Sequence, residues 1–224
     1  MEKLRVLLVD DHTVVRQGLR VLLEAEPDMR IVGEAETGRQ AIQLTKKHLP
    51  DVVVMDIAMP MLNGLEATRQ IIKEAPHTKV LVLSSYSDDE YVQQLTEAGA
   101  AGYLLKQTAA SDLIKAVREA RKGNAFFSPA ISKRLLDHYR DAFMKGIPVR
   151  KRAELLTSRE AEVLQLIAEG KPNKQIASEL CISIKTVEKH RQQVMNKLNI
   201  HDVAGLTRYA ISKGIIESNA GMRL

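Results

Sequence analysis

The sequence predicts an α/β domain with a doubly wound five-stranded parallel sheet, followed by a small all-α domain of four helices that contains a helix-turn-helix. Short apolar runs alternate with helical patterns through the first 123 residues, as in sheets covered by helices on both faces. Polar side chains stand where four of these runs end. Four closely spaced helical patterns with an excess of basic residues then follow. We expect a first domain at 1–123, a linker with a short helix at 124–153 and a second domain at 154–218.

The first domain is predicted to hold five strands and five helices. Each strand is a short apolar run bounded by turn residues, and each helix carries apolar residues at helical spacing. Alternation of this kind is typical of the strand order 2-1-3-4-5, in which the chain reverses between strands one and three. The expected strands are 4–9, 31–35, 51–55, 79–83 and 102–105, and the expected helices are 12–25, 38–47, 65–73, 88–97 and 111–122.

The candidate reactive group of the first domain is Asp56, which follows the third apolar run. A parallel sheet buries its strands on both faces, so an ionisable group belongs at the carboxyl end of a strand, where open α/β sheets bind ligands. Strands one, four and five also end in polar residues, namely Asp10 with Asp11, Ser84 and Lys106. The reversal between strands one and three predicts that the three carboxylates meet in one crevice.

Three neighbouring carboxylates repel one another unless a cation neutralises them. A hard divalent ion suits carboxylate, carbonyl and water ligands, and Mg²⁺ is the cofactor that we expect. Such an ion would draw a phosphoryl group onto Asp56, with Lys106 and the Ser84 hydroxyl binding its oxygens. Simpler interpretations remain open: the acid pair could cap the helix at 12, Ser84 could open a helix and Lys106 could be a solvated surface residue.

Charge is spread unevenly between the two halves of the chain. Residues 1–123 hold 16 Lys and Arg against 18 Asp and Glu, a net charge of −2, and the remaining residues hold 17 against 10, a net charge of +7. The basic C-terminal half of the chain, with the linker included, predicts a polyanionic partner. No apolar run approaches the roughly 18 residues of a membrane span, and the first residues form a strand rather than a signal peptide. The single cysteine, Cys181, lies in an apolar context and fits a core position in a reducing compartment, so we expect a cytoplasmic protein without a membrane partner.

Capping residues set the boundaries of the four helices in the second domain. Thr157 and Glu160 form a capping box for the first helix. Asn173, Ser183 and Asp202 are N-cap candidates for the next three. The second, third and fourth helices are expected at 173–180, 184–198 and 202–213.

The second and third of these helices are the helix-turn-helix candidate, because a short and a long helix are separated by three or four residues. The long helix has an apolar stripe opposite a polar one. Lys and Gln on the polar stripe can bond to base edges in the major groove, and Glu can accept a hydrogen bond from cytosine. Both helix N-termini would present backbone amides to phosphates. The apolar stripe is Ile184, Val187, Val194 and Leu198, and the polar stripe is Lys185, Lys189, Gln192 and Asn196, with Glu188 beside it.

Residues 3–122 resemble the receiver domain of two-component response regulators. The likeness rests on the acid pair after the first strand and on Asp56 before the letters MPMLNG. The resemblance implies a flavodoxin-like sheet and phosphorylation of Asp56 by a sensor histidine kinase. It also implies a Mg²⁺ site formed by Asp10, Asp11, Asp56 and the carbonyl of Ala58.

Two further motifs carry the same resemblance. Ser84 follows the letters KVLVL, and the letters YLLK from Tyr103 to Lys106 follow GAAG. The resemblance implies that Ser84 and Tyr103 move together as a switch. One departure is Gln107, which stands where many receivers carry a proline after the lysine.

Residues 155–217 resemble the LuxR-type helix-turn-helix through the letters LTSREAEVLQLIAEG, NKQIASEL and ISIKTVEKHRQQVMNKLNI. Together the two halves resemble the NarL/FixJ family of response regulators over nearly the whole chain. The resemblance implies a homodimer in the phosphorylated state that binds double-stranded DNA, with the last helix helping to pair two DNA-binding domains. It further implies that Lys185, Thr186, Glu188, Lys189, His190 and Gln192 face DNA, with Asn173 and Lys174 on the backbone.

Two other functions are compatible with parts of the sequence. One is a constitutive DNA-binding regulator whose first domain is a scaffold that is never phosphorylated. The other is a phospho-aspartyl phosphohydrolase, which would also use strand-end carboxylates and Mg²⁺. Such enzymes typically carry a second acid two residues after the nucleophile, where this chain has Ala58.

Overall fold

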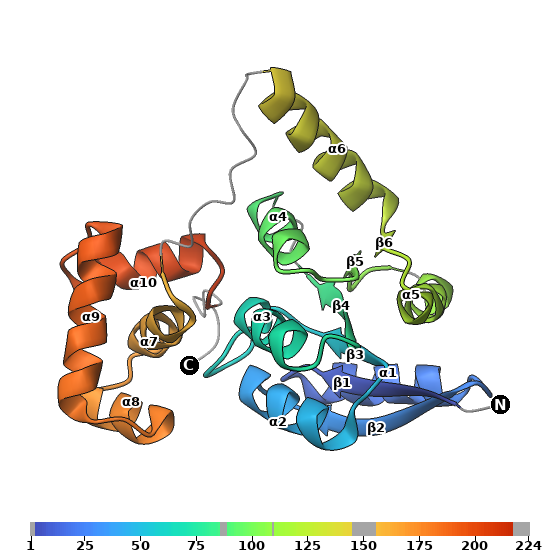
Figure 1. Ribbon diagram of the computed structural model, residues 1–224, viewed down its shortest axis with the longest axis horizontal. Helices are drawn as coiled ribbons and strands as arrows, with labels where there is room; N and C mark the ends of the chain where they lie inside the picture. The colour runs from blue at the N-terminus through green and yellow to red at the C-terminus, as the bar shows by residue number, and fades with distance from the viewer. Residues whose placement is uncertain (1–2, 86–88, 109, 145–155, 217–224) are drawn as a thin grey trace. The chain divides into compact units, whose positions relative to one another are not determined.

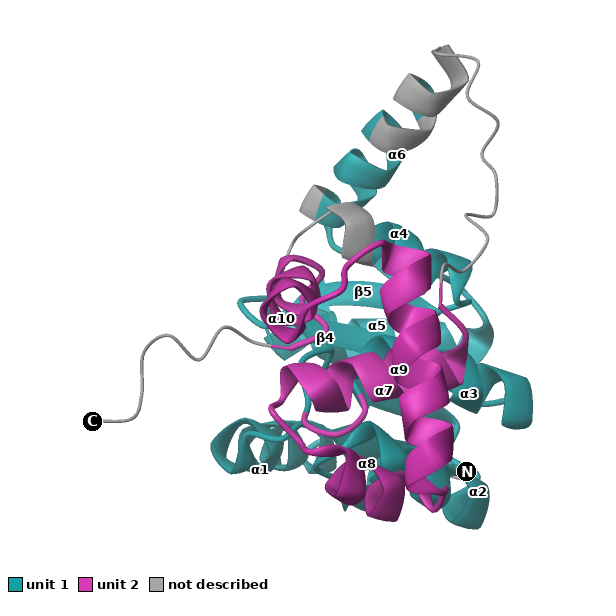
Figure 2. Ribbon diagram, turned by 90° about the vertical axis from the view of Figure 1, so that its left-hand side faces the viewer, with its two compact units in different colours: residues 1–59, 63–150 teal, residues 60–62, 151–224 magenta. Residues whose placement is uncertain are grey.

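The computed structural model describes residues 3–85, 89–108, 110–144 and 156–216 of the chain (Figure 1). The chain divides into two compact units, one of residues 1–59 with 63–150 and the other of residues 60–62 with 151–224 (Figure 2). The first unit is built on a parallel sheet and the second is helical. The last part of the predicted linker, residues 145–153, lies outside the described residues.

The sheet of the first unit has six parallel strands in the order β2-β1-β3-β4-β5-β6. The predicted order 2-1-3-4-5 is confirmed, and the prediction of five strands is corrected by β6. This strand has only two residues, too few to give an apolar run, and it lies so close to β5 that a side chain at Gly102 would come within 2.2 Å of the Phe126 carbonyl oxygen. The strands are β1 (Leu4–Val9), β2 (Met29–Ala35), β3 (Val52–Met55), β4 (Lys79–Ser84), β5 (Gly102–Leu105) and β6 (Phe126–Phe127).

Helices cover both faces of the sheet, as the alternating pattern predicts. α1 and α5 pack on one face, and α2 and α3 pack on the other, with α4 beside α3 (Figure 1). The four residues of β3 are buried completely, and burial of an aliphatic side chain stabilises the fold by about 2 kcal/mol. The helices are α1 (Thr13–Glu24), α2 (Gly38–His48), α3 (Gly64–Glu74), α4 (Asp89–Glu97) and α5 (Ala110–Lys122), all within a residue or so of their predicted bounds.

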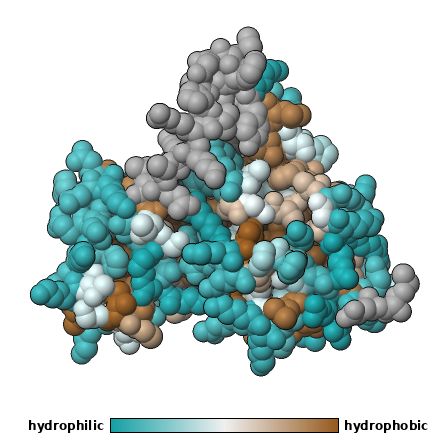
Figure 3. Space-filling model, in the orientation of Figure 1, coloured by the Kyte–Doolittle hydropathy of each residue, from teal (hydrophilic) through white to brown (hydrophobic). Residues whose placement is uncertain are grey.

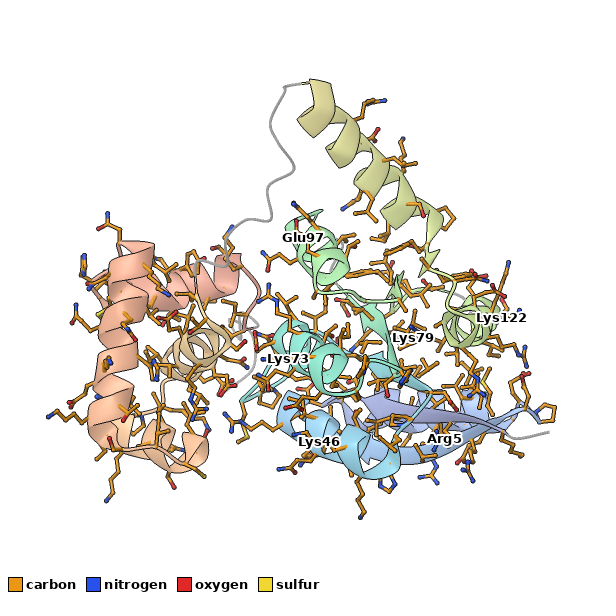
Figure 4. All side chains as sticks on the ribbon, in the orientation of Figure 1. Arg5, Lys46, Lys73, Lys79, Glu97 and Lys122 are labelled. Atoms are coloured by element: carbon orange, nitrogen blue, oxygen red, sulfur yellow. The ribbon has the colours of Figure 1, made fainter. Side chains whose placement is uncertain are left out.

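Lysines lie in the last turns of three of these helices, at Lys46 on α2, Lys73 on α3 and Lys122 on α5 (Figure 4). A cation near a helix C-terminus interacts favourably with the helix dipole. In a parallel α/β sheet these helix ends lie at the amino ends of the strands, where Arg5 and Lys79 also lie (Figure 4). Ligands bind at the opposite end of such a sheet, where the strands have their carboxyl ends.

The short helix expected in the linker is α6 (Pro129–Met144). It begins at Pro129, and proline is preferred at the first helical position because its missing amide proton is not needed there. Ile131 is buried and α6 packs against α4, whereas Leu136 is 70% exposed. The first turn of α6 therefore belongs to the fold of the first unit.

The second unit consists of α7 (Ser158–Ala168), α8 (Asn173–Leu180), α9 (Ile184–Leu198) and α10 (Val203–Ser212) around one apolar core. The predicted capping box of Thr157 and Glu160 is present, and Glu160 also accepts a hydrogen bond from Lys197 at 2.6 Å. Ser183 and Asp202 cap α9 and α10 through their side chains, as predicted. Within the described residues of the chain, no helix is long and apolar enough to cross a membrane.

Three predictions for the second unit are wrong. Asn173 is the first helical residue of α8 rather than its cap, which is Pro172. Cys181 is exposed rather than in the core, because it ends α8 in the left-handed conformation with φ of 52°. Ile184 is 46% exposed, since it is the first residue of α9 and precedes the turns that pack inward.

Candidate functional site

The ends of β1 and β3 bring together the three carboxylates singled out in the sequence. β1 and β3 pair in register with Val9 opposite Met55, so both strands end level with each other. The amide of Asp56 donates to the Val9 carbonyl at 2.8 Å. Asp10 and Asp56 are almost fully buried and Asp11 is partly exposed. We name these three carboxylates, together with Lys106, the acid pocket.

Lys106 is the cation of the acid pocket. Its Nζ lies 2.8 Å from Oδ2 of Asp10 and 2.8 Å from Oδ2 of Asp56. It follows β5, and its amide donates to the carbonyl of Ser84 at 2.8 Å. The interpretation of Lys106 as a solvated surface residue is therefore wrong, because it bridges two buried carboxylates.

Burial dominates the electrostatics of Asp56. Burial, with the charge of Asp10 as a smaller cause, raises the pKa of Asp56 to about 6 against the opposing effects of Lys106 and of the Ile57 amide. Burial alone would lower the pKa of Lys106, but its hydrogen bonds with Asp10 and Asp56 outweigh that effect and the pKa is raised. At neutral pH the pocket therefore holds an ionised carboxylate in a poorly solvated place.

The acid pocket is compatible with a divalent cation. One ligand atom from each of Asp10, Asp11, His12 and Asp56 lies within 4.8 Å of all the others. Oδ1 of Asp11 is shielded from solvent and accepts no hydrogen bond of good geometry. A shielded carboxylate oxygen is satisfied by a cation, so these residues fit the Mg²⁺ ion that the sequence predicts.

The loop after β3 is held tightly against Asp56. Ile57 donates its amide to Oδ1 of Asp56 at 2.8 Å, and the Gly64 amide donates to the Ile57 carbonyl at 2.7 Å. A side chain at Gly64 would lie 1.9 Å from the Asp56 carbonyl oxygen, so this close approach requires glycine. Ala58, two residues after Asp56, is buried in the same loop.

Ser84 and Tyr103 lie on neighbouring strands beside the pocket. Ser84 is the last residue of β4. Tyr103 in β5 pairs with Val82, which lies two residues before Ser84 in β4. Both side chains are buried. Ser84 does not open a helix, because α4 begins only at Asp89.

Two residues that sequence reasoning missed complete the surroundings of the pocket. Arg16 is buried, and its guanidinium donates to the Asp10 carbonyl at 2.6 Å, to Glu34 at 3.0 Å and to Glu36 at 2.8 Å. A signal existed, because Arg16 falls at helical spacing from the buried Leu23 on the inward face of α1. Through these hydrogen bonds Arg16 connects the end of β1, at Asp10, to Glu34 in β2 and to Glu36 just after it.

His12 is the second missed residue. It occupies the N-cap position of α1, but no side chain caps this helix. Its Nδ1 lies 2.9 Å from Oδ1 of Asp11 and 3.3 Å from Oδ1 of Asp10, and its amide donates to Asp10 at 2.8 Å. The interpretation of the acid pair as a helix cap is therefore wrong.

In the second unit, the outer face of α9 carries the predicted polar stripe. Val187 and Val194 are buried on the opposite face. The unit is mainly hydrophilic on the face that Figure 3 displays. Thr186 and His190 are partly buried, and the Thr186 hydroxyl lies 2.8 Å from that of Ser183 within the cap. The exposed residues of the stripe are Lys185, Glu188, Lys189, Gln192 and Asn196.

The start of α8 is tied to α9 by a contact that the sequence did not predict. Oδ1 of Asn173 accepts a hydrogen bond from the guanidinium of Arg191 at 3.2 Å. Lys174 beside it is exposed. This bond sets the position of the α8 N-terminus relative to the polar stripe of α9, which is the pairing that a helix-turn-helix needs.

Two protein-family models match the chain. The model described as "Response regulator receiver domain" matches residues 6–118. The model described as "Bacterial regulatory proteins, luxR family" matches residues 154–210. The first match includes the acid pocket and the second includes α8 and α9.

Curated relatives match over almost their whole length. The transcriptional regulatory protein LiaR of Bacillus subtilis is 42% identical over 207 residues, which cover 92% of this chain and 96% of LiaR. The transcriptional regulatory protein DegU of Brevibacillus brevis is 38% identical over 226 residues, 96% of each chain. Among solved structures, RcsB of Salmonella enterica serovar Typhimurium, bound to the promoter rprA with the phosphomimetic BeF₃⁻, has a TM-score of 0.56 and 29% identity, covering 94% of this chain and 100% of that one.

Proposed function

The chain belongs to the NarL/FixJ family of two-component response regulators, with a receiver domain and a LuxR-type DNA-binding domain, and we propose that phosphorylation of Asp56 controls its binding to DNA. The observation that carries this proposal is the pairing of buried Asp56 with Lys106 in the acid pocket. A buried carboxylate with one cationic partner is positioned both to react and to have its product charge neutralised. The phosphodonor is the phosphohistidine of a sensor histidine kinase.

In the phosphorylation step, an Asp56 carboxylate oxygen attacks the phosphorus of the phosphohistidine. The phosphorus–nitrogen bond breaks, and the kinase histidine leaves with the bonding electron pair and takes up a proton. Lys106 and the Ser84 hydroxyl bind the phosphoryl oxygens as their charge develops. Asp10, Asp11, Asp56 and the Ala58 carbonyl would hold Mg²⁺, which would supply further neutralisation of charge when bound.

The switch couples the pocket to a distant face through β4 and β5. Ser84 moves toward the phosphoryl oxygen and Tyr103 follows into the space that it leaves. Their burial on paired strands supports this coupling, because a tightly packed interior changes between discrete arrangements. The surface made by α4, β5 and α5 then changes and favours a homodimer.

In the DNA-bound state, α9 lies in the major groove. Lys185, Lys189 and Gln192 contact base edges or phosphates, and Glu188 accepts from cytosine. Thr186 and His190 also face the DNA from α9, and Asn173 and Lys174 at the N-terminus of α8 contact the DNA backbone. Two copies paired through α10 read two half-sites about one helical turn apart.

The proposal assigns residues 1–123 to the receiver, 124–153 to the joint that contains α6, and 154–218 to DNA binding. Because its partner is the DNA of a bacterial cell, the regulator works in the cytoplasm. A phosphohydrolase would need an acid where this chain has Ala58.

Sedimentation velocity of the full chain with Mg²⁺, before and after addition of beryllofluoride, tests the switch. Beryllofluoride stands in for the phosphoryl group on Asp56. We expect a shift from monomer to dimer, and no shift in the Asp56→Asn variant. Binding to duplex DNA selected by this protein from a random library should tighten under the same conditions. Equal affinity with and without beryllofluoride would contradict the proposal and favour constitutive DNA binding.

A further inference from the structure

The imidazole of His12 lies against the two carboxylates at the end of β1. Its Nδ1 is 2.9 Å from Oδ1 of Asp11 and 3.3 Å from Oδ1 of Asp10. The backbone amide of His12 donates to the same Asp10 oxygen at 2.8 Å, which fixes the residue over the carboxylate. Its side chain is 53% exposed, so an ion can reach it from solvent.

The contact between His12 and Asp11 has the spacing of two neighbouring ligands of one ion. Although Nδ1 and Oδ1 are 2.9 Å apart, the Asp11 oxygen accepts no hydrogen bond of good geometry. Two atoms bound to one octahedral ion at about 2.1 Å each lie about 3.0 Å apart when they are adjacent. The two donors are therefore already spaced for chelation.

The described contacts of the His12 imidazole are with the carboxylates of the acid pocket, including a hydrogen bond between its Nδ1 and Oδ1 of Asp10 at 3.3 Å. His12 is the N-cap of α1, yet its side chain caps no amide of the helix. One potential metal-ligating atom from each of four residues lies within 4.8 Å of the other three: Asp10, Asp11, His12 and Asp56. Within the described part of the chain, this is the group of residues that could hold a metal ion. Three oxygen donors and one imidazole nitrogen are a ligand set different from that of a pure carboxylate site.

We propose that His12 is a ligand of the pocket and that it widens the range of bound ions from Mg²⁺ to first-row transition ions such as Ni²⁺ and Zn²⁺. Imidazole suits these ions, whereas Mg²⁺ prefers oxygen ligands and water. The inference rests on the proposed function, because it takes the acid pocket to be a cation site. A transition ion held by His12 and the carboxylates competes directly with Mg²⁺.

Calorimetric titration of the tag-free full chain with Ni²⁺, and separately with Mg²⁺, tests the inference. The variants are His12→Ala and His12→Asn, the second of which installs a preferred N-cap residue and so protects α1 from fraying. The control is His77→Ala, which removes an exposed histidine of the same unit far along the chain from the pocket. We expect both His12 variants to weaken Ni²⁺ binding by about tenfold or more and to leave Mg²⁺ binding within about twofold.

Competition provides the second measurement. Added Mg²⁺ should weaken apparent Ni²⁺ binding to the wild-type chain, because both ions use the same carboxylates. Unchanged Ni²⁺ affinity in both His12 variants, or an equal loss in His77→Ala, would overturn the role of His12 while leaving the Mg²⁺ site intact. A wild-type chain that binds Ni²⁺ but not Mg²⁺ would overturn the proposed Mg²⁺ site instead, and binding of neither ion would overturn both.

Discussion

Asp56 is kept in an environment that costs folding free energy. Its pKa is raised to about 6, chiefly by burial, so the native state binds a proton more tightly than the unfolded chain. Below the ordinary pKa of aspartate both states are protonated and the residue has no effect on stability. As the pH rises through 6 the native carboxylate ionises, and the whole penalty applies above that pH.

Asp56→Asn should therefore stabilise the receiver without Mg²⁺, and more so at high pH. We expect a gain of roughly 1–3 kcal/mol at pH 8, since the substitution also takes a charged partner from Lys106, and almost none at pH 4. Urea unfolding of the full chain in a chelator, followed by circular dichroism at the two pH values, measures the difference. An equal gain at both pH values would show that ionisation is not its cause.

At the scale of elements, Arg16 connects three parts of the receiver. From α1 it donates to the carbonyl of Asp10 at the end of β1 and to Glu34 and Glu36, the first within β2 and the second just after it. A buried guanidinium that satisfies a carbonyl and two carboxylates is costly to remove, because each partner then loses its hydrogen bond. Arg16 is thus a positioning residue for Asp10.

Arg16→Met should lower stability by about 2–4 kcal/mol and weaken Mg²⁺ binding severalfold. The matched control is Arg20→Met, one turn along the same helix, whose guanidinium pairs with Glu24 and Glu34 at the surface. We expect no measurable change in Mg²⁺ affinity for that variant. Calorimetric titration with Mg²⁺ decides between them, and an equal loss in both would mean that Arg16 acts through general stability.

The elements were largely predictable because apolar runs and capping residues are local signals. β6 was not predicted, because a strand of two residues gives no periodic pattern in the sequence. Its pairing with β5 also depends on close approach at Gly102, where a side chain would not fit. Cys181 was predicted to be buried from its apolar neighbours, but its left-handed backbone turns the side chain outward. Local pattern thus specifies an element, whereas the direction of a side chain at its end depends on backbone geometry.

The candidate site was predictable to the extent that topology determines it. Strand ends in a doubly wound sheet converge, so Asp10, Asp56 and Lys106 could be brought together from the sequence. Arg16 and His12 were missed because each lies within an apparently ordinary amphipathic helix or its cap. Their contacts depend on side-chain directions that spacing alone does not give.

At the scale of the molecule, charge is divided unevenly between the two halves of the chain. The first 123 residues carry a net charge of −2 and the remainder +7. A basic segment gains affinity for DNA by releasing counterions, so under the proposed function the basic linker and the exposed lysines on α9 would both add to that affinity.

Lys189→Ala should weaken binding to the selected duplex by about tenfold at physiological salt, with a smaller loss on random DNA if the lysine reads a base. The control Lys133→Ala removes the same charge from an exposed position on α6. Titrations at several salt concentrations separate the two kinds of contact. Loss of a phosphate contact reduces the salt slope by about one, and identical affinities for the two variants would remove Lys189 from the interface.

The ammonium group of Lys106, which bridges Asp10 and Asp56, determines the formal charge of the acid pocket. Three carboxylates and one ammonium leave the acid pocket with a formal charge of −2, which one divalent ion cancels. Phosphorylation adds further negative charge, so the phosphorylated pocket attracts cations more strongly than the resting one. Under the proposed function, the binding of a divalent cation and the phosphorylation of Asp56 are therefore expected to favour each other.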